Sequence, residues 1–205
     1  MSEIDLHGKL IALEGMDFTG KSTLVPLLCE RLRAAGYDVV ASREPGGTPV
    51  GELVRTILLD RRHETMLPLS ELLLFMVSRA QHVHEIVLPA LEQNKTVVTS
   101  RYRMSSLAYQ GYGRQIDQKL IRSLNEAATV GRKADVTFVI DLPVEVALRR
   151  KQGQGDRIEQ EAIAFYERVR HGYLDLARND PSVHVLDGTA TVSELDEALA
   201  NALGV

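Results

Sequence analysis

One short stretch near the N-terminus constrains the fold more than any other feature of this chain. It reads Gly15-Met16-Asp17-Phe18-Thr19-Gly20-Lys21-Ser22, a complete match to the pattern G-x-x-x-x-G-K-[ST]. An apolar run of strand length, residues 9–13, comes directly before it, and a segment with helical spacing of leucines follows. A strand, a glycine-rich loop and a helix in this order predict a loop that binds phosphate at the carboxyl end of a strand.

The residue types of this loop suit a nucleoside triphosphate. Its glycines allow backbone N–H groups to point into one concavity, and the following helix adds partial positive charge at its N-terminus. Lys21 would meet the outer phosphates, and Ser22 would offer its hydroxyl to a Mg²⁺ ion that arrives with the nucleotide. We therefore expect ATP, with its Mg²⁺, to bind along Gly15, Met16, Asp17, Phe18, Thr19, Gly20, Lys21, Ser22 and Thr23.

Along the rest of the chain, strand-like runs alternate with segments of helical period. The expected strands are 9–13, 38–42, 96–99, 136–141 and 183–186. The expected helices are 21–35, 50–59, 69–91, 118–128, 144–151, 158–177 and 192–203. Short apolar strands separated by helices imply a parallel sheet with right-handed crossovers. We predict a single α/β domain over residues 1–205, with the three-layer P-loop NTPase fold: a five-stranded parallel sheet flanked by helices.

Composition narrows the functional classes. The chain has 205 residues, of which 44% are hydrophobic, a net charge of −4 and an isoelectric point near 5.9. It therefore lacks the overall positive field that favours nucleic-acid binding. The N-terminus does not resemble a signal peptide, and no apolar run reaches the ~18 residues of a membrane span. The single cysteine, Cys29, suits a reducing compartment. We expect a cytoplasmic protein that binds neither nucleic acid nor membrane.

A switch GTPase would carry the same loop, but it also needs a guanine-reading N/T-K-x-D element. The nearest candidate is Arg132-Lys133-Ala134-Asp135. Arginine stands there in place of Asn or Thr, and Asp135 precedes a predicted strand instead of following one. This segment is better interpreted as a solvated turn, so the sequence argues against a GTPase.

Five motifs follow one another in the order and spacing of a known family. They are the phosphate-binding loop, REPGGT at 43–48, ELLLF-x-x-x-RAQH at 71–82, SRY-x-x-SSLAYQG at 100–111 and DR-x-E at 156–159. Over residues 9–187 the chain resembles a thymidylate kinase, a nucleoside monophosphate kinase that transfers the γ-phosphate of ATP to dTMP and gives dTDP and ADP for dTTP synthesis. The resemblance implies ATP and dTMP as substrates, Mg²⁺ with the ATP, and a homodimer.

The residues themselves indicate an acceptor site beside the loop. Arg43 and Arg101 each lie just past a predicted strand, where two guanidinium groups could hold one phosphate monoester. Phe75 and Arg79 are four residues apart on one predicted helix face, so a base could stack on the ring while the guanidinium donates to its edge. Core packing is the alternative for Phe75.

The resemblance implies roles for further residues. Phe75 would stack on thymine, Arg79 would donate to it, and Ser105 or Ser106 would lie near its other edge. Tyr109 would lie under the deoxyribose, and Asp17 would accept from the 3′-hydroxyl and lie near the metal; a turn-stabilising role is the alternative for Asp17. The metal site would be Ser22 and Asp17. The dTMP site would comprise Asp17, Arg43, Pro45, Phe75, Arg79, Arg101, Ser105, Ser106, Tyr109 and Gln110.

Phosphoryl transfer to this acceptor needs no general base, because a monophosphate with a second pKa near ~6 is already an anion. Catalysis would come from Lys21, Arg101, Mg²⁺ and a glycine-containing lid loop over about residues 149–157, in which Arg149 and Arg157 are favoured. Two residues depart from the family pattern. Ser100 stands where relatives carry Asp, which predicts weaker metal binding with Glu14 or Asp17 in compensation, and Phe18 is bulky for a phosphate-binding loop.

Two other functions remain open from the sequence. A kinase of similar fold with another acceptor, a deoxynucleoside or a different monophosphate, would share the loop, although paired arginines argue against an uncharged acceptor. A catalytically weak nucleotide-binding protein would be consistent with Ser100. Apolar segments at 72–77 and 86–91 are candidates for the surface of the homodimer.

Overall fold

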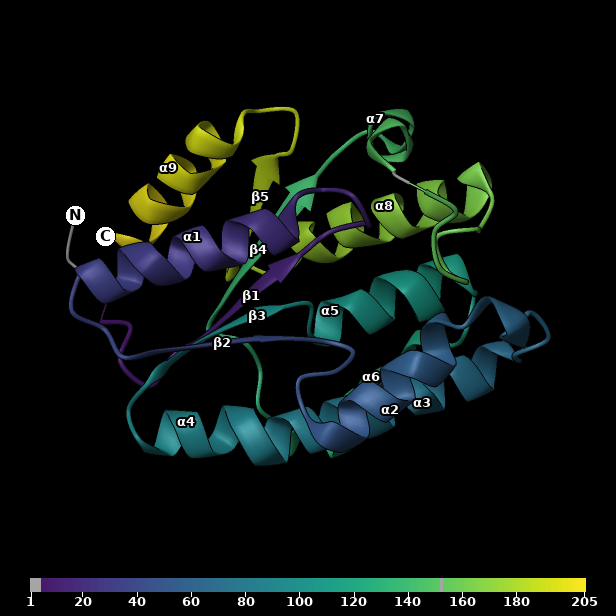
Figure 1. Ribbon diagram of the computed structural model, residues 1–205, viewed down its shortest axis with the longest axis horizontal. Coiled ribbons are helices and arrows are strands. Elements are labelled where there is room, and N and C mark those ends of the chain that lie inside the picture. Colours follow the sequence, from purple (N-terminus) through teal and green to yellow (C-terminus); the bar gives the residue numbers. More distant parts are fainter. Residues whose placement is uncertain (1–4, 152) are drawn as a thin grey trace.

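The computed structural model describes residues 5–151 and 153–205 of the chain. A five-stranded sheet in the order β2-β3-β1-β4-β5 forms its centre (Figure 1), and every strand pair is parallel. Its strands are β1 (Leu10–Glu14), β2 (Val39–Arg43), β3 (Thr96–Ser100), β4 (Val136–Asp141) and β5 (Val183–Asp187). Because β1 lies in the middle of the sheet, the loop that follows it opens at the centre of the carboxyl edge.

Helices connect the strands. They are α1 (Lys21–Ala34), α2 (Pro49–Leu59), α3 (Pro68–His82), α4 (Leu88–Glu92), α5 (Arg103–Ser106), α6 (Gln118–Thr129), α7 (Val144–Arg150), α8 (Ile163–Arg178) and α9 (Val192–Leu203). A 3₁₀ turn spans Arg61–His63, and π-helical turns span Val83–Val87 and Leu107–Gly113. Several helix starts have clear local causes, such as the hydroxyl of Thr48, which accepts from Gly51 N at the start of α2.

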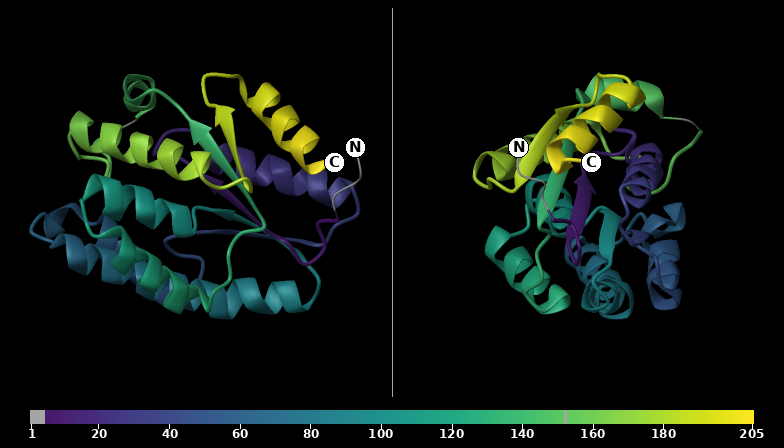
Figure 2. Two further views of the ribbon diagram at one scale, coloured as in Figure 1. Left: turned by 180° about the vertical axis from the view of Figure 1, so that it is seen from behind. Right: turned by 90° about the vertical axis from the view of Figure 1, so that its left-hand side faces the viewer.

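Alternating side chains of the strands build two apolar layers. Ile11 and Leu13 of β1 face a cluster that includes Leu28 of α1 and Leu199 of α9. Leu10 and Ala12 point to the other face of the sheet. There they pack with Val87 of the π-helical turn and Ala90 of α4. A third apolar cluster joins α7 and α8 to β4. The sheet is thus covered on both faces (Figure 2), which explains why β1 is buried along its whole length.

These observations confirm the predicted fold class, and the strand bounds agree with the expected ones to within one residue at each end. Two helices differ. The expected helix 69–91 is interrupted by the π-helical turn at Val83–Val87, and the helix expected from residue 158 begins only at Ile163. The sequence pattern also gave no sign of α5 and the π-helical turn after it. No helix in the described part of the chain is long and apolar enough to cross a membrane.

Candidate active site

The phosphate-binding loop runs between β1 and α1 and lies tightly against the neighbouring strand. Gly15 has a φ of 132° and Gly20 a φ of 95°, values that favour glycine. A Cβ added at Gly15 would lie 2.6 Å from the carbonyl oxygen of Ile140 in β4. A side chain at this position would therefore push the loop away from the sheet and spoil its shape.

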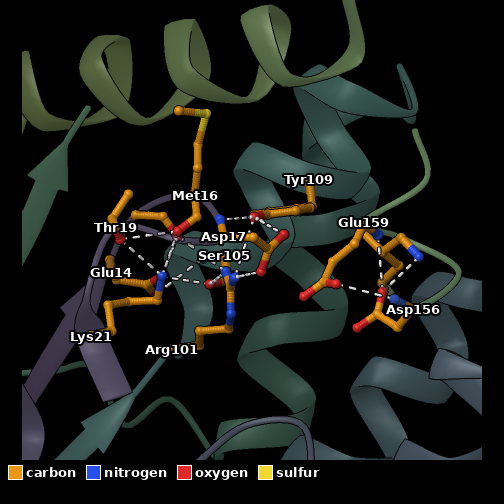
Figure 3. A network of polar contacts seen from close by, with 12 residues as sticks. Glu14, Met16, Asp17, Thr19, Lys21, Arg101, Ser105, Tyr109, Asp156 and Glu159 are labelled. Atoms are coloured by element: carbon orange, nitrogen blue, oxygen red, sulfur yellow. Dashed lines mark hydrogen bonds and ion pairs between the residues drawn. The ribbon is translucent and has the colours of Figure 1, made fainter. Parts of the chain in front are cut away.

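Lys21 is buried within the loop. Its Nζ donates to the carbonyl oxygens of Gly15 (3.0 Å) and Met16 (2.5 Å) and to Oγ1 of Thr19 (3.1 Å) (Figure 3). Burial, together with the nearby Arg101 cation, lowers the pKa of Lys21 to about 7. Among the described residues, the hydrogen bonds of this amine go to neutral oxygens of the loop, and an anionic phosphate would favour its charged form.

An open hollow of about 1160 Å³ runs along the loop and the start of α1. Ser22 and Thr23 lie exposed in the first turn of α1, and Ser22 lines the hollow together with Lys21 and Gly20. The other predicted donor-site residues, from Gly15 to Thr19, form the loop itself. The structure therefore brings together the residues that the motif predicted for ATP.

Phe18 has a place in this loop that the sequence did not reveal. Its φ of 65° is unusual for a residue with a side chain and costs on the order of 1–3 kcal/mol. Its half-buried ring packs against the apolar cluster of α7 and α8, which includes Ile158 and Tyr166. Burial of the ring offsets the backbone strain and ties the loop to α8.

Beside the hollow lies a second cavity of about 570 Å³, counting its open mouth. We call it the acceptor cavity. It is lined by Asp17, Glu44, Pro45, Arg55, Leu59, Phe75, Arg101, Ser105, Ser106, Tyr109, Gln110, Asp156, Ile158 and Glu159. Eight of these belong to the predicted dTMP site: Asp17, Pro45, Phe75, Arg101, Ser105, Ser106, Tyr109 and Gln110.

Arg101 connects the acceptor cavity to the phosphate-binding loop. It follows β3 with a left-handed φ of 71°, and its Nη2 forms an ion pair with Asp17. Its Nη1 donates to the carbonyl oxygen of Gly15 at 3.2 Å. The hydroxyl of Tyr109 donates to Asp17 at 2.8 Å and accepts from Arg101 at 3.2 Å (Figure 3).

These contacts fix the charge of Asp17. Burial acts to raise its pKa, but the cations Arg101 and Lys21 outweigh burial and lower the pKa below its ordinary value. Asp17 is therefore an anion that holds Arg101 in place, which is more than the turn-stabilising role that the loop sequence left open.

The second arginine of the acceptor cavity is Arg55 of α2, which the sequence reasoning missed. It lines both the cavity and the hollow, and its Nη1 donates to the carbonyl oxygen of Pro45 at 3.0 Å. Burial and the charge of Arg43 lower its pKa, as expected where cations gather to meet an anion.

Arg43 lines the hollow together with Arg101 and Arg55, but it is not part of the lining of the acceptor cavity. Its side chain is largely exposed and forms an ion pair with Glu52 at 2.7 Å. The sequence correctly located Arg43 at the end of a strand, but it could not show that the side chain turns toward α2. The structure therefore pairs Arg101 with Arg55 at the acceptor cavity.

Phe75 of α3 is half-buried and belongs to the lining of the acceptor cavity. Arg79, one turn later, does not line the cavity. It is 1% exposed, and its guanidinium donates to Glu44 (2.7 Å), Ser106 (2.7 Å), Asn125 (2.6 Å) and the carbonyl oxygen of Tyr102 (2.8 Å). In this structure Arg79 reaches the cavity through Glu44 and Ser106, which both line it.

The lid loop separates the two arginines that were favoured for catalysis. Arg149 is exposed in the last turn of α7 and has no hydrogen bond or ion pair among the described residues. Arg157 is buried instead. Its Nε donates to the carbonyl oxygen of Leu58 at 2.8 Å, and its Nη2 lies 2.7 Å from Glu71. This placement corrects the expectation for Arg157: its guanidinium anchors the lid loop to α2 and α3 and is not free to reach a phosphate.

Two more carboxyl groups line the acceptor cavity: Asp156, near the end of the lid loop, and Glu159, just after it. Asp156 Oδ1 accepts from the backbone N–H groups of Ile158 and Glu159, both at 2.9 Å. Burial is the main cause that raises the pKa of each. The DR-x-E motif marks this segment as part of the family pattern, but no local pattern predicts that Asp156 and Glu159 line the cavity.

The donor set suits a Mg²⁺ ion that arrives with a nucleotide. Ser22 lines the hollow together with the carboxylates Asp17 and Glu159, and no group of three or more His, Cys, Asp or Glu residues that could hold a metal ion occurs among residues 5–151 and 153–205. Mg²⁺ that takes most of its ligands from phosphate and water needs only one or two protein oxygens. These residues therefore fit the ion.

Glu14, one of the two residues expected to supply outer-shell charge for the metal, does not line the hollow. Glu14 is completely buried, and its carboxylate accepts from the backbone N–H groups of Tyr102 (2.8 Å) and Ser105 (3.1 Å) and from the hydroxyl of Tyr173 (3.0 Å). These contacts turn it toward the start of α5 and away from the hollow, whose lining does not include it.

Comparisons with known proteins agree with this geometry. The family profile described as "Thymidylate kinase" matches residues 13–199. The thymidylate kinase of Kosmotoga olearia is 46% identical over 190 residues, covering 91% of each chain. That of Desulfosudis oleivorans is 42% identical over 203 residues, covering 94% of this chain and 95% of its own.

A solved structure gives the same result in three dimensions. The crystal structure of thymidylate kinase from Ehrlichia chaffeensis superposes with a TM-score of 0.80 at 34% identity, covering 97% of this chain and 100% of its own. A matched profile over most of the chain, close relatives of equal length and a shared fold lead to one conclusion. The chain belongs to the thymidylate kinase family.

Proposed function

We propose that this chain transfers the γ-phosphate of ATP to dTMP, giving dTDP and ADP. The observation that carries the proposal is the contact between the two anion-binding surfaces. Arg101 of the acceptor cavity is held by Asp17 and by the carbonyl oxygen of Gly15, which both belong to the phosphate-binding loop. Two bound phosphates would therefore lie against one continuous cluster of charges, as direct transfer requires.

The donor would lie along the hollow. The loop amides, the N-terminus of α1 and Lys21 would hold the triphosphate, and Ser22 with Asp17 would hold Mg²⁺. Mg²⁺ would neutralise part of the negative charge of the phosphates. Lys21 would exchange its neutral loop acceptors for phosphate oxygens and so be held as a full cation.

The acceptor would lie in the second cavity, with its phosphate between Arg101 and Arg55 and its base against Phe75. Tyr109, fixed by Asp17 and Arg101, would form the floor under the sugar. Ser105, Ser106, Pro45 and Gln110 would complete the wall. Arg43 would contact phosphate groups bound in the hollow. Arg79 would hold Ser106 in position.

No residue needs to remove a proton from the nucleophile, because the acceptor phosphate is already ionised above its second pKa of ~6. The protein would act by alignment and by meeting the charge that develops on the transferred group. Lys21 and Arg101 would perform this task. Arg149 is the lid arginine that is free to join them, whereas Arg157 holds the base of the lid loop.

We also propose a homodimer in the cytoplasm. Exposed apolar side chains form stripes on α2 (Val50, Leu53 and Ile57) and α3 (Leu69, Leu73 and Val77), and these helices pack side by side. Exposed apolar side chains on two neighbouring helices are typical of a subunit interface. The predicted segment 86–91 is mostly turned toward the sheet, where Val87 and Ala90 are buried, so α2 and α3 support the dimer better.

A panel of acceptors tests the proposed activity. Formation of ADP from Mg-ATP should be fastest with dTMP when dTMP, dUMP, dCMP, dGMP, AMP and thymidine are compared at equal concentration. A faster rate with another acceptor would favour a kinase of different specificity. An absence of turnover with all of them, despite ATP binding, would favour a nucleotide-binding protein without this activity.

A further inference from the structure

Glu71 is a charged residue in the core of the molecule that the proposed mechanism does not use. It belongs to the first turn of α3 and is 1% exposed. Three side chains share its carboxylate: Arg114 (2.9 Å), Arg157 (2.7 Å) and Gln110 (2.9 Å). Removal of such partners from a buried carboxylate strongly destabilises a protein. These three contacts therefore hold the carboxylate of Glu71 in one position.

The contact with Gln110 has a consequence for the acceptor cavity. Burial acts to raise the pKa of Glu71, but the hydrogen bonds and charge of Arg114 outweigh it and lower the pKa. An ionised carboxylate can only accept hydrogen bonds. The Gln110 group that faces it must therefore be the amide NH₂, and Nε2 does donate to Glu71 Oε1. This leaves Oε1 of Gln110 as the free end of the amide, and within the described residues it accepts no hydrogen bond.

A second buried charge acts on the neighbouring group in the same way. Nη1 of Arg79 donates to Oγ of Ser106 at 2.7 Å. Because this contact uses a lone pair of the hydroxyl, the hydroxyl hydrogen stays free to donate. Ser106 and Gln110 both line the acceptor cavity. The cavity wall thus presents an acceptor from Gln110 and a donor from Ser106.

This order of groups is complementary to an imide edge. Thymine and uracil carry a ring N–H donor beside carbonyl acceptors, whereas cytosine carries a ring-nitrogen acceptor beside an amino donor. If the base keeps the position in which the amide oxygen of Gln110 accepts from the ring N–H of thymine, the same oxygen would face the ring nitrogen of cytosine, and both groups would lack a partner. Sites built around fixed hydrogen-bonding groups reject such analogues strongly.

We propose that Glu71 is a positioning residue for base specificity: by binding the NH₂ of Gln110 it turns the amide oxygen toward the base and selects an imide over cytosine. The inference rests on the proposed function, because it takes the base of dTMP to lie against Gln110. It assigns to Glu71 an effect on the choice of acceptor, which a residue of merely structural importance would not have.

The test compares kcat/KM for dTMP, dUMP and dCMP in the wild type and in Glu71→Gln. A neutral amide at position 71 can donate as well as accept, so it no longer dictates the orientation of Gln110. We expect the dTMP to dCMP ratio to fall by at least about tenfold. The dTMP to dUMP ratio should stay within twofold, because both bases present the same edge.

Two control variants separate the role of Glu71 from loss of stability. Asp196→Asn removes another partly buried ion pair, with Arg31 of α1 (2.7 Å), and should leave every ratio unchanged. Arg157→Lys weakens the lid anchor but keeps the Glu71–Gln110 contact, and it should also preserve the dTMP to dCMP ratio. Should Glu71→Gln fail to fold, Glu71→Asp withdraws the carboxylate by one methylene, keeps the charge for both arginines, and should lower the same ratio.

An unchanged dTMP to dCMP ratio in a folded Glu71 variant would overturn the inference while leaving the proposed function intact. The same holds if Arg157→Lys lowers the ratio as much as Glu71→Gln does, because the effect would then pass through the lid anchor. Wild-type protein that fails to phosphorylate dTMP would instead overturn the proposed function, and this inference with it.

Discussion

At the scale of single residues, Arg55 and Arg43 can be compared directly as a test residue and its control. Both are arginines beside the phosphate sites, but only Arg55 lines the acceptor cavity, while Arg43 pairs with Glu52. We predict that Arg55→Gln raises the KM for dTMP by about tenfold or more, since a hydrogen bond to a charged group contributes about 1.5–3 kcal/mol. The KM for ATP should change less.

The control is Arg43→Gln, for which steady-state kinetics should give a much smaller change in the KM for dTMP. The opposite result, a larger acceptor defect in Arg43→Gln, would show that Arg43 turns into the acceptor cavity when dTMP binds. The original prediction from the sequence would then be right and the pairing of Arg55 with Arg101 wrong.

From the lowered pKa of Lys21 we predict that ATP binding depends on pH. Burial in the empty loop lowers its pKa to about 7, and bound phosphate would raise this pKa because it favours the charged form. Below pH 7 the lysine is charged in both states, so it contributes no pH dependence. Above pH 7 binding must take up a proton, and affinity should fall as pH rises.

Isothermal titration calorimetry between pH 7.5 and 9 checks this, because ATP itself is fully ionised there. Titrations in buffers of different ionisation enthalpy should report net proton uptake by the protein. Affinity that is constant over this range, with no proton uptake, would mean that Lys21 is already fully charged in the empty loop.

The residues of the site differ in how far the sequence could identify them. Lys21 and Ser22 follow from a contiguous motif, in which chain order alone fixes geometry. Phe75 followed from helical spacing combined with the resemblance. Arg55 could not be found this way, because it reaches the cavity from a separate element, α2, and no short-range pattern records that approach.

At the scale of elements, the π-helical turn at Leu107–Gly113 positions the wall of the acceptor cavity. Its wide backbone spacing includes a bond from Arg114 N to the carbonyl oxygen of Tyr109, five residues earlier (2.9 Å). Such turns recur at functional sites. Here the turn carries both Tyr109 and Gln110 into the cavity. Helical periodicity assumes a regular 3.6-residue turn, which is why the sequence predicted neither this turn nor the one at Val83–Val87.

The lid loop provides a second pair of arginines to compare. Arg149 is exposed, whereas Arg157 is buried against Glu71 and Leu58. We predict that Arg149→Ala lowers kcat by at least about tenfold with little effect on thermal stability, because removal of a cation that meets the transferred phosphate costs rate. Arg157→Ala should lower the melting temperature, because it leaves the buried carboxylate of Glu71 without one of its partners.

Kinetics together with calorimetric melting of both variants checks this division. A variant Arg149→Ala with wild-type kcat would remove Arg149 from the mechanism. Normal stability of Arg157→Ala would show that the lid anchor is not a structural contact in solution.

At the scale of the whole molecule, the fold was predictable because strand and helix patterns alternate along almost the entire chain. The inner strands β1, β3 and β4 are buried almost along their whole length, so each is a short apolar run that is easy to recognise. The surface was less predictable. Leu72 and Leu73 are adjacent in sequence, but Leu72 is fully buried and Leu73 is 45% exposed, a difference that only the packed structure reveals.

The exposed face of α2 and α3 predicts the oligomeric state. We expect the wild type to be a dimer, and we expect Leu53→Glu to yield a monomer, since Leu53 is 69% exposed and a charge there would be buried in the interface. Light scattering after size-exclusion chromatography measures the mass directly. Glu197→Lys, on α9, is the control and should remain dimeric, and a wild-type monomer would contradict the proposal.

The central claim is that one cluster of charges holds two phosphates in contact, so that the terminal phosphate passes directly from ATP to dTMP. The most direct measurement follows γ-³²P-labelled ATP with Mg²⁺ and dTMP. We predict that the label appears in dTDP with wild-type protein, and that Lys21→Met and Arg101→Met, which remove one charge on each side, lower this rate by at least about a hundredfold. Label that appears only in inorganic phosphate, or transfer that persists in both variants, would contradict the account.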